Sequence, residues 1–143
     1  MALARPQKTK PAEPVKLGNI YSASNYHDPI IKRAVWFLKY HGAKTVADPL
    51  TEIMRLRLLK YIAHENWLII PMPLHKTRLR ERGYNQSELL AKNLSDKLNI
   101  PLNNNVLYKI RATPTQVSIK NRRDRLKNLE GAFAVSNSGL IEG

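Results

Sequence analysis

The chain of 143 residues contains no cysteine, so a disulfide framework and a cysteine-ligated zinc site are both excluded. Its four histidines lack a close spacing such as H-x-x-x-H, and we expect no metal site of the protein's own. No stretch approaches the roughly 18 apolar residues of a membrane span, and the N-terminus lacks the apolar core of a signal peptide. These absences predict a cytoplasmic protein with no membrane span and no zinc.

Acidic residues are also scarce, with 11 Asp and Glu against 24 Lys and Arg, a net charge of +13. The segment from Lys76 to Lys127 holds thirteen basic and four acidic residues, so nine of the excess positive charges are concentrated there. Such an excess favours polyanionic partners: nucleic acid, nucleotides or an acidic membrane surface. A solubilising surface is the other interpretation.

The N-terminal residues 1–17 are predicted to form a flexible basic arm, because lysine and arginine alternate with proline there and little can be buried. Residues 18–143 are long enough for one domain with its own core. Two helices are expected near its start. The first begins at Asp28-Pro29 and stops at Gly42, and the second begins at Asp48-Pro49.

A strand–helix–strand unit follows over residues 67–110. The apolar segment 67–70 is typical of a buried strand, Asn85 and Glu88 have the spacing of a capping box, and 106–110 has the composition of a second strand. A crossover helix implies parallel strands. The expected fold is therefore α/β, a parallel sheet flanked by helices, and incomplete at its C-terminal side.

Two shorter elements complete the expected order. A helix is expected within 117–127 and a strand over 132–135. The aromatic residues of the first helix, Trp36, Phe37 and Tyr40, are expected to be core or interface, since nothing in the sequence places them near the basic segment.

A loop rich in proline and arginine follows the predicted strand 67–70. The arginine fork matches phosphate oxygens, and ligands of open α/β sheets lie beyond the carboxyl ends of strands. In extended chain the alternating arginines share one side, about 7 Å per two residues. We predict a phosphate or pyrophosphate site here; its candidate residues are His75, Lys76, Arg78, Arg80, Arg82, Gly83, Asn85 and Gln86.

Several of these residues also have structural interpretations. Gly83 is expected to adopt a positive φ, and Asn85 to cap the following helix, whose N-terminus is itself an anion site. His75 either bonds an oxyanion or fixes the turn. Tyr84 is a candidate for stacking on a base, whereas Tyr108 fits the core of the second strand. No catalytic residue is identified.

A second group of candidates lies in the basic segment after residue 110. Its residues have two interpretations, a hood over the phosphate site or a nucleic-acid contact. They are Arg111, Thr113, Gln116, Arg122, Arg123 and Arg125. For the last three arginines an exposed helix face is an equally good explanation.

Two motifs, in the same order, resemble those of the competence protein F (ComF) family of type I phosphoribosyltransferase-like proteins. The first comprises IIPMPLH at 69–75, Arg78, RGYNQ at 82–86 and LLA at 89–91; the second comprises Arg111, Thr113, Gln116, Arg122, Asn128 and GAF at 131–133. The resemblance covers about residues 30–135. It implies a parallel-sheet fold that binds 5-phosphoribosyl 1-diphosphate (PRPP) with Mg²⁺, and a link to DNA uptake in natural transformation.

The chain departs from the family pattern in two ways. It has no N-terminal module of paired cysteines, and it has neither the Asp-Asp loop nor the Thr-Thr-Gly that hold the ribose and 5-phosphate of PRPP in such enzymes. We therefore expect a family member that stops before its sugar-phosphate site, with phosphoribosyltransferase activity uncertain and the acceptor base unknown.

Two other functions stay open at this point. One is a non-enzymatic binder of single-stranded DNA. The other is a protein-interaction module whose helices over 30–42 and 48–62 dock onto a partner such as a competence helicase. An unpaired sheet edge also favours a homodimer.

Overall fold

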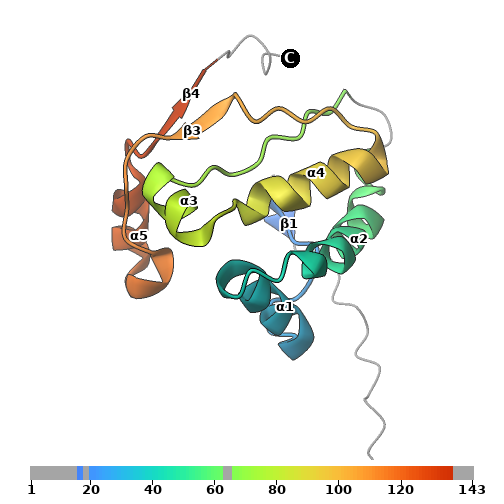
Figure 1. Ribbon diagram of the computed structural model, residues 1–143, viewed down its shortest axis with the longest axis horizontal. Helices are drawn as coiled ribbons and strands as arrows, with labels where there is room; N and C mark the ends of the chain where they lie inside the picture. Colours follow the sequence, from blue (N-terminus) through green and yellow to red (C-terminus); the bar gives the residue numbers. More distant parts are fainter. Residues whose placement is uncertain (1–15, 18–19, 63–65, 137–143) are drawn as a thin grey trace, which may run out of the picture.

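In the computed structural model, which describes residues 16–17, 20–62 and 66–136, the helices Pro29–Tyr40 and Ala47–Leu58 lie on one side of the helix Gln86–Leu98 and extended chain lies on its other side (Figure 1). The elements in chain order are β1 (Lys16–Leu17), β2 (Ile20–Tyr21), α1 (Pro29–Tyr40), the 3-10 helix η1 (Lys44–Val46), α2 (Ala47–Leu58), α3 (Lys76–Arg82), α4 (Gln86–Leu98), β3 (Leu107–Lys109), the 3-10 helix η2 (Gln116–Ser118), α5 (Arg122–Leu129) and β4 (Phe133–Val135).

The start of α1 follows from its cap. The Asp28 carboxylate accepts hydrogen bonds from the backbone N–H groups of Ile30 at 2.8 Å and Ile31 at 3.4 Å, and Pro29 needs no such partner. The helix ends at Tyr40, shortly before Gly42, which has a φ of 64°. The predicted bounds of this helix are confirmed.

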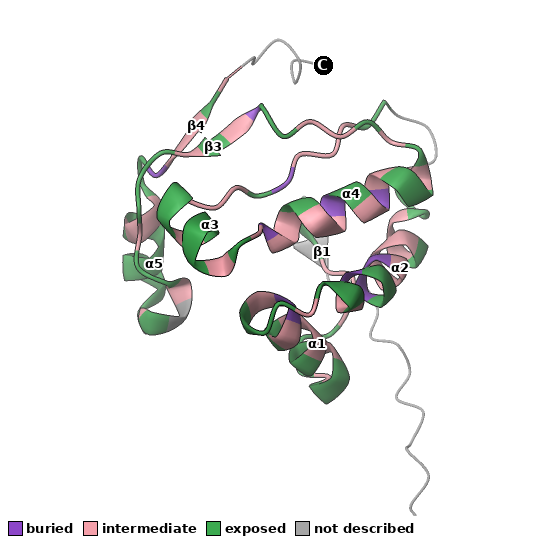
Figure 2. Ribbon diagram, viewed as in Figure 1, coloured by how far each residue is buried: buried purple, intermediate pink, exposed green. Residues whose placement is uncertain are grey.

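The core of the helical layer lies where α1 meets α2. Leu38, Ala47 and Leu50 are buried together, and partly buried residues of α1 and α4 pack around them (Figure 2). The second helix begins one residue earlier than expected, because η1 leads directly into it. A fully buried Thr51 stays satisfied by donating its hydroxyl to the Ala47 carbonyl at 2.7 Å.

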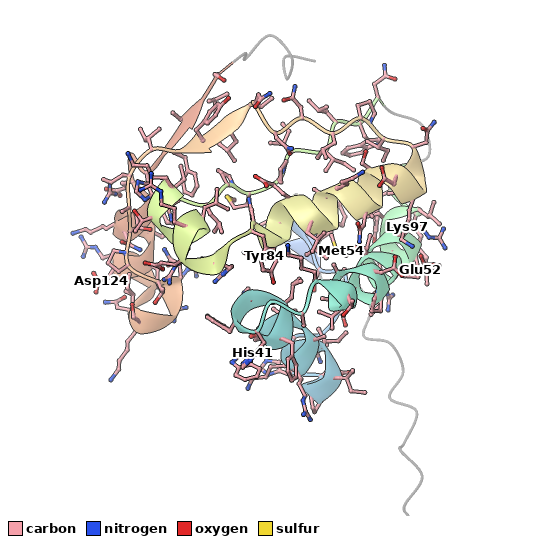
Figure 3. All side chains as sticks on the ribbon, in the orientation of Figure 1. His41, Glu52, Met54, Tyr84, Lys97 and Asp124 are labelled. Carbon is pink, nitrogen blue, oxygen red and sulfur yellow. The ribbon has the colours of Figure 1, made fainter. Side chains whose placement is uncertain are left out.

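The central helix α4 is fixed at both ends. Asn85 caps it by accepting from the Ser87 N–H at 2.9 Å, which confirms the cap. Near its C-terminus, Lys97 reaches across to α2, 2.9 Å from the Asp48 carboxylate and 3.7 Å from that of Glu52 (Figure 3). Both ion pairs are partly exposed and add little to the stability of the contact between the two helices.

The parallel strand pair predicted within residues 67–110 is found only in part. In the described residues the segment 67–70 forms one parallel bridge, Ile69 with Leu102, through 2.8 Å and 3.0 Å backbone bonds. Strand β3 instead pairs antiparallel with β4, with Tyr108 opposite Ala134. The ladder cannot continue past Ile70 because Pro71 and Pro73 have no N–H to donate.

The expected helix over 117–127 is replaced by η2 and a later helix, α5. The Asn121 side chain accepts from the Arg123 N–H at 2.9 Å, so the helix begins only after Asn121. The predicted arm falls mostly on residues 1–15, outside the described residues; at its end, β1 pairs with β2. None of the described helices is both long and apolar enough to cross a membrane.

Candidate anion-binding site

The arginine-rich segment after Pro73 is a helix, α3, rather than an extended loop. His75 caps it, its Nδ1 accepting from the Thr77 N–H at 3.3 Å, and Gly83 ends it with a φ of 78°. The expectation that Arg78, Arg80 and Arg82 share one side is therefore wrong. At 3.6 residues per turn, Arg82 lies about 40° around the helix from Arg78, whereas Arg80 lies about 160° away.

Arg78 and Arg82 face a cleft of about 400 Å³ formed by three separate parts of the chain. These are the C-terminus of α1, the segment from Leu74 to Gln86 that contains α3, and the segment from β3 to η2. The cleft is lined by Lys39, Tyr40, Leu74, His75, Thr77, Arg78, Glu81, Arg82, Gln86, Lys109, Ala112, Thr113, Pro114, Thr115 and Gln116.

Positive charge dominates this cleft. Among the described residues, four cationic side chains line it, Lys39, Arg78, Arg82 and Lys109, against a single carboxylate. That carboxylate belongs to Glu81 and lies 2.9 Å from the Arg78 guanidinium, on the same helix. Because both members of this pair are substantially exposed, the pairing is weak and does not cancel the cationic field.

Arg82 is held in place by two contacts. Its guanidinium donates to the side-chain oxygen of Gln86, one turn further along the chain. Its guanidinium carbon also lies 5.6 Å from the centroid of the Tyr40 ring on α1. The two contacts orient the arginine and leave further N–H donors of its fork for a ligand.

Lys109, at the end of β3, is partly buried in the wall of the cleft. Burial lowers the pKa of this lysine, and the neighbouring charges of Arg111 and Arg78 lower it further. Its ammonium donates to the Thr113 hydroxyl at 2.8 Å and lies 5.5 Å from the Phe133 ring. An anion bound nearby would relieve the unfavourable crowding of positive charge.

Gln116, which lines the same cleft, has an unsatisfied side-chain donor. Among the described residues, its Nε2 is buried without a hydrogen-bond partner. A buried polar group without a partner costs about 1–3 kcal/mol, so such groups are usually satisfied. A ligand acceptor in the cleft is one way to satisfy it.

The predicted candidates thus divide into two sets. The structure brings six of them together at the cleft: His75, Arg78, Arg82, Gln86, Thr113 and Gln116. The others lie elsewhere: Lys76, Arg80, Gly83, Asn85, Arg111, Arg122, Arg123 and Arg125.

Three of the residues outside the cleft have structural roles. Asn85 is buried, and besides capping α4 it donates to the Met72 carbonyl at 3.1 Å. Arg111 donates to the carbonyls of Asn128 and Glu130, at 3.2 and 2.6 Å, and so ties the end of α5 to the strands. Arg125 donates to the Ile119 carbonyl at 2.7 Å.

The two tyrosines weighed from the sequence are placed differently from expectation. Tyr84 does not offer its ring for stacking: its hydroxyl donates to the Leu38 carbonyl and the ring joins the helical core, pointing towards α1 (Figure 3). Tyr108 is not core. It is 42% exposed because β3 presents that side of its short ladder outward.

Sequence reasoning missed Lys39, Tyr40 and Lys109. The first two lie more than thirty residues before the arginines, and no local pattern joins them to α3. Lys109 carried a usable signal, since it ends a strand directly before the basic segment.

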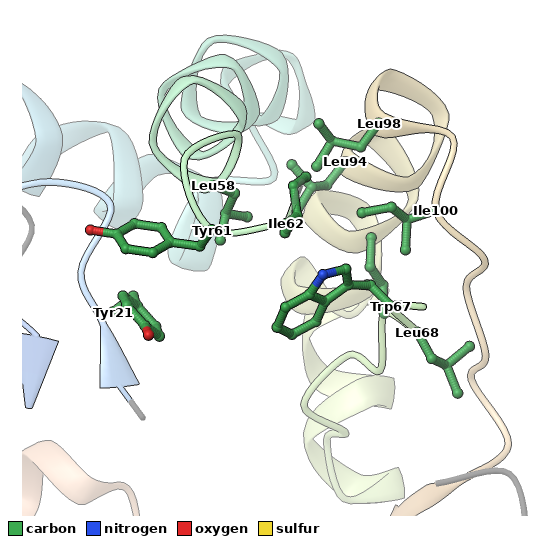
Figure 4. A pocket seen from close by; sticks show the side chains of 10 residues that line it. Tyr21, Leu58, Tyr61, Ile62, Trp67, Leu68, Leu94, Leu98 and Ile100 are labelled. Carbon is green, nitrogen blue, oxygen red and sulfur yellow. The ribbon is translucent and has the colours of Figure 1, made fainter. Parts of the chain in front are cut away.

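A second cavity, of about 500 Å³, lies between the end of α2, the segment 67–69 and the second half of α4 (Figure 4). None of the described residues that line it is charged. Its lining residues are Tyr21, Leu58, Tyr61, Ile62, Trp67, Leu68, Ile69, Leu94, Leu98 and Ile100. Although this cavity is larger, it offers no counter-charge to an anion, so the cationic cleft is the candidate site.

Among the described residues, the lining of the cleft holds one carboxylate, that of Glu81, which lies 2.9 Å from the Arg78 guanidinium. Magnesium is usually bound through one or two carboxylates together with the phosphates of its substrate. Across the described residues, no group of three or more His, Cys, Asp or Glu is placed to hold a metal ion.

Comparison with curated proteins finds competence protein F of Haemophilus influenzae, 43% identical over 70 residues. The match covers 49% of this chain and 30% of that protein's length. It confirms the resemblance to the competence protein F family over about half of the chain. No family model matches the chain, and no solved structure matches it.

Proposed function

We propose, from the kinship of this chain with competence protein F, that it binds a diphosphate-bearing anion of the PRPP type in the cleft between α1, α3 and the segment after β3. The proposal includes a phosphoribosyltransferase-like origin of the fold and a role connected with DNA uptake in natural transformation. The relative's name supports the connection with competence.

One observation carries the proposal: four cations from three separate parts of the chain converge on a cleft that also holds the unpartnered Gln116 amide. Like charges repel, so bringing four of them together is unfavourable without a bound counter-charge. A diphosphate supplies both the negative charge and acceptors for the guanidinium forks.

The residues of the cleft can bind and neutralise a diphosphate, which is also what a departing diphosphate requires. Arg78 and Arg82 would donate to its oxygens, and Lys109 would add charge at the opposite wall. Among the described residues that line the cleft, Glu81 carries the one carboxylate, and the proposal assigns it no contact with a ribose. The proposed activity of the described residues is therefore binding.

The test is calorimetry with pyrophosphate and with PRPP, each with and without Mg²⁺. Hydrogen bonds to charged groups are worth about 1.5–3 kcal/mol, so Arg78→Ala and Arg82→Ala are expected to weaken pyrophosphate binding at least about tenfold. Arg80→Ala is the matched control, since it removes the same charge from the same helix outside the cleft.

Two results would contradict this proposal. One is no heat of binding in a protein that circular dichroism shows to be folded. The other is an equal loss in all three arginine variants, which would mean that net charge alone attracts the anion.

A second candidate function is binding of single-stranded DNA, favoured by the exposed helix α5. Arg122 and Arg123 are both exposed there, on a helix with none of its eight described residues buried. Each neutralised phosphate of a single strand lowers the logarithm of affinity by about 0.7 per tenfold rise in salt. Replacing both arginines by alanine should flatten this dependence for an oligothymidylate; an unchanged slope would contradict the role of α5.

A further inference from the structure

Helix α1 has two faces of different composition. Its inner face packs on the core through Ile31, Ala34, Val35 and Leu38. Its outer face follows the i, i+3, i+4, i+7, i+8 pattern of one helix side. The residues of this side, here called the aromatic face, are Arg33, Trp36, Phe37, Tyr40 and His41.

The rings of the aromatic face contact one another. The Trp36 ring centroid lies 4.0 Å from that of His41, 5.3 Å from that of Phe37 and 6.5 Å from that of Tyr40. The Arg33 guanidinium lies 5.6 Å from the Phe37 centroid. The rings thus form one continuous array rather than separate surface residues.

Much of this array is exposed. Trp36 is 48% exposed and Tyr40 is 59% exposed, so their contacts within the chain leave a large apolar area in water. Exposing such area is unfavourable by about 25 cal/mol per Å². Contiguous exposed aromatic surface commonly marks a site of interaction.

Tyr40 connects the aromatic face to the cationic cleft. It lines the cleft beside Lys39, and the Arg82 guanidinium lies over its ring. Stacked π surfaces next to cations that track a backbone are what single-stranded nucleic acid requires of a protein. A duplex does not fit, because its bases are already stacked on one another.

We propose that the aromatic face is a stacking platform for the bases of single-stranded nucleic acid, whose phosphates lie along Lys39 and Arg82 at the cleft. This rests on the proposed binding of single strands and adds to it where the bases go. The cations along the platform, Arg33 included, favour a polyanion over an apolar protein surface as its occupant.

The two tryptophans allow a direct test. In a Trp67→Phe variant, Trp36 is the sole tryptophan and its fluorescence reports on the aromatic face alone. A ten-nucleotide oligothymidylate is expected to quench this fluorescence in a saturable manner. Pyrophosphate is not expected to do so, because it has no base.

Affinity gives the second readout. Stacking is worth about 1–3 kcal/mol per base, so Trp36→Leu is expected to weaken oligothymidylate binding about five- to 150-fold. Trp36→Phe, which keeps a ring, should recover most of that loss. Trp67→Leu is the matched control, since Trp67 is 41% exposed but lies at the apolar cavity.

The outcomes separate this inference from the functions it builds on. Equal affinities of Trp36→Leu and Trp67→Leu, or an unquenched Trp36, overturn the platform while leaving pyrophosphate and α5 binding intact. Quenching by thymidine monophosphate as strong as quenching by the oligonucleotide would contradict a single strand as the ligand and indicate a free nucleotide instead. A dimer seen by light scattering and lost in Trp36→Leu overturns it in favour of self-association. Quenching by the oligonucleotide with no pyrophosphate binding supports the platform and removes the diphosphate site alone.

Discussion

At Lys109, the same surroundings that make the positive charge unfavourable would make the binding of an anion favourable. Burial and two neighbouring arginines make its charged form less favourable than in water, and its ammonium keeps a single described side-chain acceptor, the Thr113 hydroxyl. A bound anion would reverse the sign of the local field. Ligand binding and protonation of this lysine are therefore coupled.

This coupling predicts a pH dependence of anion binding. Because the pKa of Lys109 is lowered, its charge is lost at a lower pH than that of an ordinary lysine, and affinity should begin to fall as pH rises through that shifted value. Sulfate is a suitable probe, since its own charge is constant over this range. Lys109→Arg, which stays charged, should move the fall in affinity to higher pH.

The control for this experiment is Lys92→Arg, on the exposed side of α4, where the lysine pairs with Asp96 at 3.0 Å. Its pH profile should match that of the unaltered protein. A profile unaltered in Lys109→Arg would show that this lysine does not contribute to the binding of the anion.

At the scale of elements, two asparagine N-caps with the same hydrogen-bond distance begin helices that differ in how many buried residues they contain. Asn85 and Asn121 each accept a backbone N–H at 2.9 Å, at the starts of α4 and α5. Helix α4 buries Ala91 and Leu94, whereas none of the eight residues of α5, all of them described, is buried. Loss of the first cap therefore affects the core and loss of the second does not.

Asn85→Ala is expected to lower the free energy of unfolding by about 1–2 kcal/mol, since it removes the cap and the bond to the Met72 carbonyl. Asn121→Ala should lower it by only about 0.5 kcal/mol, the low end for an N-cap, because none of the residues of α5 is fully buried. Urea titrations followed by circular dichroism measure both. Equal losses would show that α5 belongs to the cooperative core.

The sequence was most informative where a cap and an apolar stripe agree. Asp28-Pro29 and Asn85 marked the starts of α1 and α4 correctly, because each signal acts within three residues. The arginine segment was misjudged, since alternate charges suggested extended chain. Its helix is set instead by the His75 cap and the positive φ of Gly83, two signals with little apolar support.

The pairing of strands and the makeup of the cleft lay beyond sequence reasoning for a different reason. Ile69 meets Leu102, and Tyr40 meets Arg82, through contacts between residues more than thirty positions apart. Such contacts depend on how helices pack, which no local pattern reports. The cleft could be predicted from the sequence only on its α3 side and at Thr113 and Gln116.

For the whole molecule, unequal burial predicts unequal protection from hydrogen exchange. The amides of α2 and α4 should exchange slowest, because these helices pack against each other and hold half of the buried residues that the structure describes. Those of α5 should exchange close to the rate of free peptide. Exchange measured by mass spectrometry tests this, and protection of α5 equal to that of α4 would contradict it.

Pro71 and Pro73 also affect the tendency of the chain to aggregate at high protein concentration. Extended segments with a full set of donors recruit strands from neighbouring molecules and seed aggregates. Because Pro71 and Pro73 lack N–H groups, a strand from a neighbouring molecule cannot form a full set of backbone hydrogen bonds with this segment. The prolines that limit the sheet to a single bridge here also guard the molecule against polymerising through that segment.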